Sequence, residues 1–181
     1  MVSTRTKITQ DQKLVERCNV LARVIVSMKA LYADPQSSRT QRDLLETMIG
    51  AAIWYLPQPD DLWTHNISVN ALKARQAGNK VTRDHNYPRK CAARELLGTA
   101  TEELTAEFVL HRYRTKYGRF NLVTKDENRR LMKYQKADLF TTPEEAYSKA
   151  SITLVPLECD ESGKLGLQAA STGSRAAEQQ G

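Results

Sequence analysis

Residues 81–88 read VTRDHNYP and residues 120–131 read FNLVTKDENRRL, and these two stretches decide the fold that we expect. The first is short, polar and centred on Val81, which is typical of a brief strand that runs into a loop. The second opens with residues of strand character and continues into Thr-Lys-Asp-Glu, whose spacing is that of a capping box at the start of a helix. Together they predict a strand, a second strand and a helix, in that order.

The first stretch carries a carboxylate beside an imidazole. Asp84 and His85 are adjacent on an extended chain, so their side chains are expected on opposite faces. Carboxylate and amide oxygens can hold a hard divalent cation, and an imidazole can take a proton from water near neutral pH. Asn128, in the first turn of the expected helix, adds such an amide at a helix N-terminus, which itself favours anions. These residue types suit the hydrolysis of a phosphodiester with one cation.

The order Asp84-His85-x-x-Pro, then Asn121, then Asn128 followed by an arginine resembles the HNH endonucleases. The resemblance covers residues 79–137 and implies a ββα-metal core. It implies that Asp84 binds the cation and that His85 activates water. It also implies that Asn121 orients His85 and braces the loop, and that Asn128 is the second metal ligand.

The resemblance further implies a cofactor and a substrate. The cofactor is Mg²⁺ or another divalent cation such as Mn²⁺, and the substrate is DNA. The expected function is that of an HNH-type DNA endonuclease, by analogy a homing, restriction or phage or mobile-element enzyme. Two departures from the family stand out, namely a long helical connection between the two stretches and the absence of the CxxC pairs that bind zinc in some members.

The charge of the chain fits a nucleic-acid partner. Lys and Arg number 27 against 21 Asp and Glu, for a formal net charge of +6, and this excess favours contact with polyanions. The basic residues expected to bind nucleic acid are Arg83, Arg89, Lys90, Arg119, Arg129, Arg130 and Lys133. The same clusters suit a non-catalytic, basic nucleic-acid-binding accessory protein, and this alternative stays open.

The remaining sequence predicts an α+β fold that is mostly helical. Apolar residues at steps of three and four from Leu14 to Tyr32 predict one helix, and the capping box Ser38-Arg-Thr-Gln41 opens a second. The stripe expected to be buried on the second helix is Leu44, Leu45, Met48, Ile49, Ala52 and Ile53. We expect further helices over residues 67–77, 89–97, 100–117, 125–137 and 143 onward, and a strand over residues 152–157. A capping box at Thr99-Ala-Thr-Glu102 is expected to open the helix that runs to residue 117.

We expect four parts along the chain. They are an N-terminal helical scaffold (1–78), the HNH-like core with its helical insertion (79–137), a C-terminal helix and strand (138–159) and a disordered tail (160–181). A homodimer, an additional protein partner, or an adaptor role for the exposed faces of the first two helices stays open.

The sequence also predicts where the protein resides. No apolar run approaches the roughly 18 residues that span a bilayer, so we expect no membrane contact. The first 13 residues lack the apolar segment of a secretory signal. Three widely spaced cysteines do not form a disulfide framework. We therefore expect the cytoplasm of a bacterial or phage-infected cell.

Overall fold

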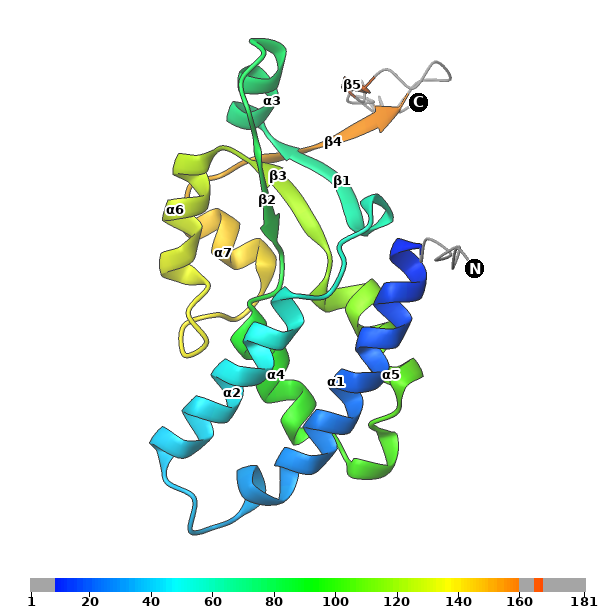
Figure 1. Ribbon diagram of the computed structural model, residues 1–181. Coiled ribbons are helices and arrows are strands. Elements are labelled where there is room, and N and C mark those ends of the chain that lie inside the picture. The colour runs from blue at the N-terminus through cyan, green and yellow to red at the C-terminus, as the bar shows by residue number, and fades with distance from the viewer. Residues whose placement is uncertain (1–8, 160–164, 168–181) are drawn as a thin grey trace, which may run out of the picture.

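The computed structural model describes residues 9–159 and 165–167 and has an α+β fold with most of these residues in helices (Figure 1). This confirms the expected fold class. The strands form a sheet in the order β2-β3-β1-β4-β5. Their bounds are Trp63–Ser68 (β1), Thr82–His85 (β2), Phe120–Val123 (β3), Leu154–Cys159 (β4) and Leu165–Leu167 (β5).

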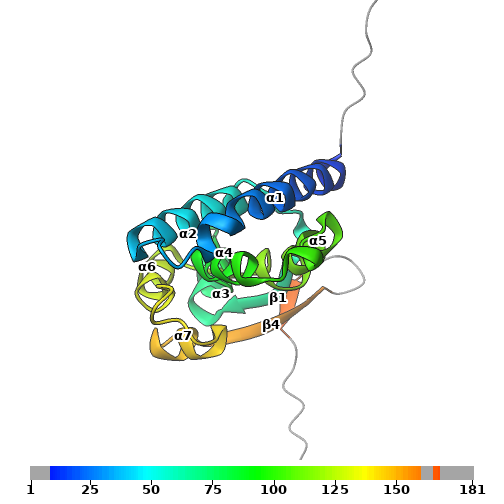
Figure 2. The same ribbon diagram turned by 90° about the horizontal axis from the view of Figure 1, so that it is seen from below.

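The helices cover the sheet from two sides. Seen from below, α1 and α2 form an outer layer over α4 and α5, and α7 lies beyond β1 and β4 (Figure 2). The α-helices are α1 (Gln10–Ala33), α2 (Arg39–Trp54), α3 (Val69–Gln76), α4 (Arg89–Gly98), α5 (Ala106–Arg112), α6 (Lys125–Tyr134) and α7 (Pro143–Lys149). Short 3₁₀ turns cover Asp60–Leu62 and Thr101–Glu103, and a π-helical turn covers Tyr113–Tyr117.

The two N-terminal helices form the predicted hairpin. Side chains buried along them are Leu14, Cys18, Leu21, Ile25, Leu45, Ile49 and Ile53. Leu44 and Met48 were expected in the same stripe but are 59% and 45% exposed. The row that packs on α4 is the one through Leu45 and Ile49, and the neighbouring row faces outward. The main core that these helices build extends to Phe120, so it joins residues on both sides of the boundary expected at residue 78.

Capping chemistry predicts most helix starts correctly. The boxes at Ser38 and Thr124 are both formed, and Pro143 takes the first position of α7. The box expected at Thr99 is wrong, because the Thr99 hydroxyl donates to the carbonyl oxygen of Glu95 and thereby closes α4. The following helix, α5, begins later, with Thr105 as its cap.

The strand β1 was not predicted, although it lies in the middle of the sheet. It pairs in parallel with β3 and antiparallel with β4. It takes residues 63–66, for which we expected no helix or strand, and residues 67 and 68, which we expected to begin a helix. The register against β3 shifts between Trp63 and Ile67, and His65 has a positive φ of 62°. Such an irregularity removes the two-residue alternation by which a strand is recognised in a sequence. The helix that we expected from Ile67 begins at Val69 instead, capped by Ser68.

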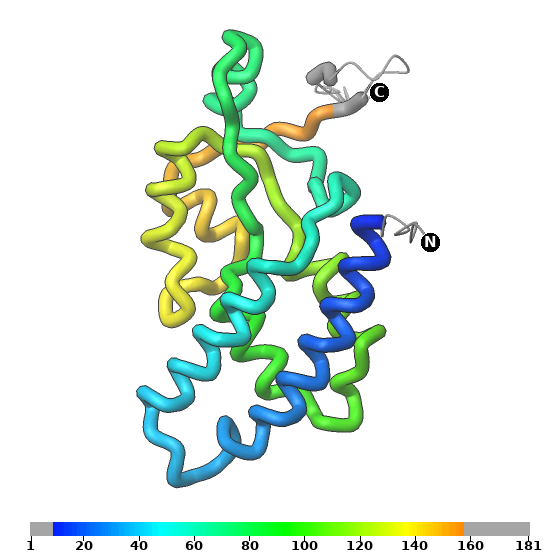
Figure 3. The backbone as a smooth tube through the Cα atoms, in the orientation of Figure 1, coloured from blue at the N-terminus to red at the C-terminus, as the bar shows by residue number. Residues whose placement is uncertain are grey.

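The predicted order of strand, strand and helix is present in β2, β3 and α6. β2 pairs antiparallel with β3, with Asp84 opposite Asn121 and His85 opposite Phe120. The tube in Figure 3 shows the chain returning from α3 into β2, with α6 beside it. Phe120 belongs to the core under α4 and α5, whereas Val123 packs with Leu131 of α6. Residues of odd and even number on these strands therefore face different helices.

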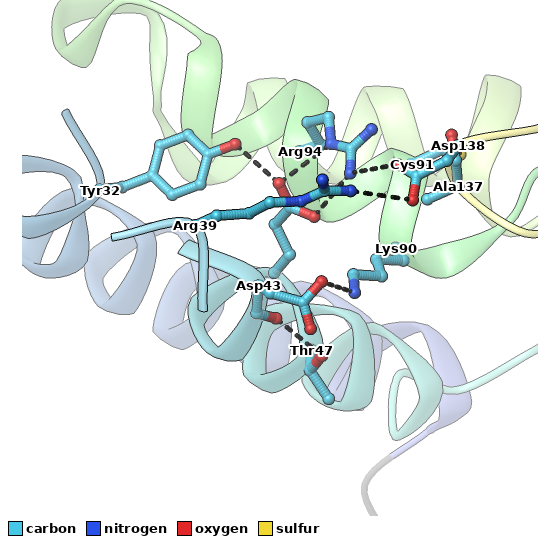
Figure 4. A network of polar contacts seen from close by, with 10 residues as sticks. Tyr32, Arg39, Asp43, Thr47, Lys90, Cys91, Arg94, Ala137 and Asp138 are labelled. Carbon is cyan, nitrogen blue, oxygen red and sulfur yellow. Dashed lines mark hydrogen bonds and ion pairs between the residues drawn. The ribbon is translucent and has the colours of Figure 1, made fainter. Parts of the chain in front are cut away.

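A network of ion pairs around the buried Glu46 connects the helical layer to the segment after α6. Glu46 is 5% exposed and accepts hydrogen bonds from the Tyr32 hydroxyl and from two nitrogens of Arg94 at 2.9 and 3.0 Å. Arg94 and Arg39 also reach Asp138, as Figure 4 shows. The network thus links α1, α2 and α4 to the segment that follows Gln135.

The C-terminal part departs from the expected disordered tail at one point. Residues 165–167 form β5, which pairs with β4 from Leu157 to Cys159, so for these three residues the expectation is wrong. The outer edge of β4 offers unpaired backbone groups that a short strand can satisfy. The remainder of that tail, and residues 1–8, lie outside the described residues. None of the helices in the described part combines the length and apolar character that crossing a membrane requires.

Candidate functional site

A cavity of about 430 Å³ opens beside β2, the strand at the edge of the sheet. Residues expected at a site from the sequence line it together: Arg83, Asp84, His85, Arg89, Lys90 and Asn128. The first three come from β2, the next two from the first turn of α4, and Asn128 from α6. Because β2 is the edge strand of the sheet in the described part of the chain, residues on both of its faces can reach the same cavity.

Asp84 is the buried carboxylate of this cavity. It is 4% exposed, and its Oδ2 accepts a hydrogen bond of 2.5 Å from the Tyr147 hydroxyl of α7. The side-chain amide nitrogen of Gln135 lies 3.2 and 3.1 Å from the two carboxylate oxygens. Burial raises the pKa of Asp84 to about 6, although the two hydrogen bonds and the charge of Arg89 act in the opposite direction. At neutral pH the carboxylate is therefore charged, but its hydrogen bonds and the charge of Arg89 do not fully offset the free-energy cost of burying that charge.

His85 faces the other side of β2, as the sequence predicted. Its ring lies 6.1 Å from that of Trp54, centroid to centroid, and its Nε2 lies 3.4 Å from the Gln58 amide nitrogen. Its Nδ1 is buried without a hydrogen-bond partner among the described residues. Burial first and the charge of Arg89 second lower the pKa of His85 to about 4. At neutral pH the ring is therefore uncharged.

One face of α6 completes the cavity. Asn128, Met132 and Gln135 line it, at the spacing of four and three residues that brings side chains to one side of a helix. The Gln135 amide nitrogen also lies 3.3 Å from the carbonyl oxygen of His85. The Gln135 amide nitrogen therefore lies among three oxygen atoms, and such a set of oxygens can also bind a cation.

Asn121 lies behind the cavity. It is 2% exposed, stands opposite Asp84 in the β2–β3 ladder, and its amide oxygen accepts a hydrogen bond from the Thr64 hydroxyl of β1. Among the described residues, the cavity lining does not include it. Asn121 therefore contacts the neighbouring strand, which fits a bracing role.

The basic residues expected to bind nucleic acid divide into two groups. Arg83, Arg89 and Lys90 line the cavity together with Lys136, which belongs to the basic cluster on the predicted helix over residues 125–137. Arg83 forms an ion pair of 2.6 Å with Asp60, and Lys90 forms one with Asp43.

The other four basic residues lie elsewhere. Arg119 lines a separate cavity of about 490 Å³ and donates to the carbonyl oxygen of Asp61, while Arg129 forms an ion pair with Asp126. Arg130 donates to the carbonyl oxygen of Ala150. Lys133 is exposed on α6 and, in the part of the chain that the structure describes, does not belong to the lining of the cavity at β2.

Sequence reasoning missed Trp54, Gln135 and Tyr147. Gln135 could have been found, because it follows Asn128 by seven residues on a predicted helix, and such residues share a face. Trp54 and Tyr147 reach the site from α2 and α7, and no local pattern indicates how these helices pack.

The donor set of the cavity suits a hard divalent cation. Carboxylate and amide oxygens, such as those of Asp84 and Asn128, are ligands that Mg²⁺ and Mn²⁺ prefer. Across residues 9–159 and 165–167, no group of three or more His, Cys, Asp and Glu side chains could hold a metal by itself. A cation here would therefore need the Asn128 amide.

Comparison of the chain with protein-family models, with curated proteins and with solved structures gives no match.

Proposed function

We propose that the protein is an HNH-type DNA endonuclease that hydrolyses phosphodiester bonds with one divalent cation, as a homing, phage or mobile-element enzyme. The observation that carries the proposal is the shared cavity. Asp84, His85 and Asn128 come from positions up to 44 residues apart in the chain and line one cavity at the β2–β3–α6 unit.

Asp84 and Asn128 hold the cation in this proposal. The buried carboxylate has no cationic side chain within ion-pair distance among the described residues, and Gln135 and Tyr147 are its only hydrogen-bond donors there. When bound, Mg²⁺ or Mn²⁺ stabilises negative charge on the phosphate oxygens. Asp84 approaches this cation site from β2, and Asn128 approaches it from α6.

His85 is the general base. Its imidazole is neutral at physiological pH because burial and Arg89 disfavour the protonated form. The lowered pKa makes the ring a weak base in the free protein, and a phosphate bound in the cavity would raise that pKa and strengthen the ring as the acceptor of a proton from the attacking water. Asn121 is a positioning residue, because its hydrogen bond with Thr64 fixes β3 behind the strand that carries both catalytic side chains.

DNA approaches through the cationic lining. Arg83, Arg89, Lys90 and Lys136 surround the opening, and Asp84 is the one carboxylate that lines it among the described residues. This balance favours a phosphate over a neutral substrate. Arg119, Arg129, Arg130 and Lys133 lie away from this opening, so contact with DNA there stays a prediction.

Nicking of supercoiled plasmid tests the activity. Purified protein is incubated with plasmid in Mg²⁺, in Mn²⁺ and in EDTA, and open-circle product is followed with time. We expect cleavage with either cation, none in EDTA, and a loss of at least about 100-fold in His85→Ala, which is the low end of general base catalysis.

His111→Ala is the matched control, since His111 is exposed on α5, away from the cavity. It should cleave as the unmodified protein does. Equal cleavage by His85→Ala and His111→Ala would remove His85 from its proposed role. No cleavage by the unmodified protein in either cation would overturn the nuclease proposal.

A non-catalytic DNA-binding protein is the second candidate. The cationic lining favours it equally, because Arg89 and Lys136 attract phosphates whether or not a bond is cut. In this case DNA binding would be unchanged by Mg²⁺, and Asp84→Asn would not alter it.

A further inference from the structure

Trp54 is the feature of the cavity that the proposed chemistry does not use. It is the last residue of α2, it is 57% exposed, and it lines the cavity that holds Asp84 and His85. Single exposed apolar residues are ordinary on protein surfaces. An indole at the rim of a cationic cavity is a more specific arrangement and needs an explanation.

The packing of α2 on α4 holds the indole in place. A Cβ atom at Gly50 would lie 3.4 Å from the backbone of Arg89, so the glycine allows close approach of the two helices. Trp54 follows Gly50 by four residues and therefore lies one turn further along the same side of α2. The guanidinium of Arg89 lies over the Trp54 ring, 2.9 Å from its centroid. This contact fixes the orientation of the ring and leaves much of its area open.

The surroundings supply what a nucleotide needs besides a flat surface. Arg89, Lys90 and Lys136 line the same cavity and can contact the phosphates on either side of a base. The His85 ring lies 6.1 Å from the indole, so a base on Trp54 brings its own phosphate into the cavity with the proposed general base.

We propose that Trp54 is a stacking platform for an unstacked base, and that the site takes single-stranded DNA in preference to duplex. The substrate class rests on the proposed function. Bases in a duplex are covered on both faces by their neighbours, so an aromatic side chain can stack only on a base that is free of them. Tight binding through phosphates alone would not distinguish the two forms of DNA in this way.

Fluorescence offers a direct test, because the chain has two tryptophans, Trp54 and Trp63. The variant Trp63→Phe leaves Trp54 as its single tryptophan. It is titrated in EDTA, where no cleavage is expected, with an oligothymidylate and with the same strand annealed to its complement. We expect saturable quenching by the single strand at concentrations where the duplex quenches little. Absent quenching, or equal quenching by both forms, would overturn the proposal.

Affinity of otherwise unmodified variants gives the second readout, measured by anisotropy of a labelled single strand in EDTA. Trp54→Ala should bind about 5- to 150-fold more weakly, the loss that corresponds to one stacked base. Trp54→Tyr should recover most of the affinity. Tyr55→Ala is the matched control, because Tyr55 is the adjacent aromatic residue, is 71% exposed and, in the described part of the chain, is no part of the cavity lining.

The outcomes separate this proposal from the proposed function. Binding that depends on Trp54, without cation-dependent cleavage, would support the platform and contradict the nuclease. Cation-dependent cleavage by a Trp54→Ala variant that still binds single strands as tightly as the unmodified protein would support the nuclease and contradict the platform.

Discussion

Asp84 and Glu127 are both buried carboxylates beside the same sheet, 4% and 2% exposed, yet their surroundings differ sharply. Glu127, in the first turn of α6, accepts hydrogen bonds from Ser68, Asn70 and both the backbone and the hydroxyl of Thr124. Burial acts to raise its pKa, but the bonds from Ser68 and Thr124 outweigh this and lower it. For Asp84, burial wins and the pKa rises to about 6.

The difference separates a structural acid from an acid available to a ligand. The Glu127 carboxylate is stabilised in its charged form by the fold itself, and it joins β1, α3 and α6. The Asp84 carboxylate lines an open cavity with two uncharged donors, and its charged form gains most from an added cation.

The strongest way to test this comparison is to remove the structural acid. Glu127→Ala leaves the donors of Ser68, Asn70 and Thr124 without their acceptor, and we expect a loss of about 2–4 kcal/mol in the free energy of unfolding. Urea denaturation measures it. Asp126→Ala, in the same turn but 78% exposed, should change stability by less than about 0.5 kcal/mol. Similar small losses in both variants would mean that Glu127 does not hold these elements together.

Asp84→Asn should raise the free energy of unfolding, whereas Glu127→Ala should lower it. A folded-state pKa of about 6, above the ordinary 3.8, means that the folded chain binds more protons than the unfolded chain between these values. The stability from this group is present below about pH 4 and lost as the pH rises through about 6. Without divalent cations, Asp84→Asn should therefore be more stable than the unmodified protein by about 3 kcal/mol at pH 7.

The pH dependence supplies the control for this variant. At pH 4 the advantage should disappear, since Asp84 is then protonated in the unmodified protein as well. Urea midpoints at both pH values, in EDTA, give the comparison. A variant that is less stable than the unmodified protein at pH 7 would show that the Asp84 carboxylate is as well satisfied as that of Glu127.

Gln135 sharpens the comparison, because its amide nitrogen takes the position between the Asp84 oxygens and the His85 carbonyl. If it competes with the cation, Gln135→Ala should bind Mg²⁺ a few-fold more tightly. Calorimetric titration measures this, with Gln76→Ala, an exposed glutamine of α3, as the control. Weaker binding would instead make Gln135 a cation ligand through its oxygen.

The smallest expected effect is on the salt dependence of DNA binding, through the basic residues near Asp84 and Glu127. Lys136 lines the cavity of Asp84, whereas Arg129 forms an ion pair with Asp126 next to Glu127. Lys136→Ala should reduce the slope of log affinity for single-stranded DNA against log salt by about 0.7. Arg129→Ala should leave the slope unchanged, and a reversed pattern would move the DNA-binding surface to the outer side of α6.

Local patterns predicted the elements that local chemistry determines. The boxes at Ser38 and Thr124 start helices because side-chain oxygens satisfy free backbone N–H groups within one turn. The same reasoning failed at Thr99, where the hydroxyl bonds backward to Glu95. β1 was missed because its irregular register hides the alternation of a strand.

Part of the candidate site could likewise be predicted from local sequence. Asp84, His85 and Asn128 were named because their types and order resemble a metal-dependent hydrolase, and they line one cavity. Trp54 and Tyr147 were not, since they join the site through the packing of α2 and α7. The seven basic residues were chosen by sequence distance alone, and four of them lie away from the cavity. Arg129, Arg130 and Lys133 do so because successive residues of α6 point in different directions, and Arg119 does so because it lies on the connection before β3.

Cation binding to the cavity tests the central claim most directly. Manganese is titrated into the unmodified protein, Asp84→Asn, Asn128→Ala and the control Asp60→Asn, with bound ion measured by electron paramagnetic resonance. We expect one ion per chain in the unmodified protein and in Asp60→Asn, and a loss of at least about tenfold in affinity in the other two. Equal binding by all four proteins, or no binding by any, would contradict the account.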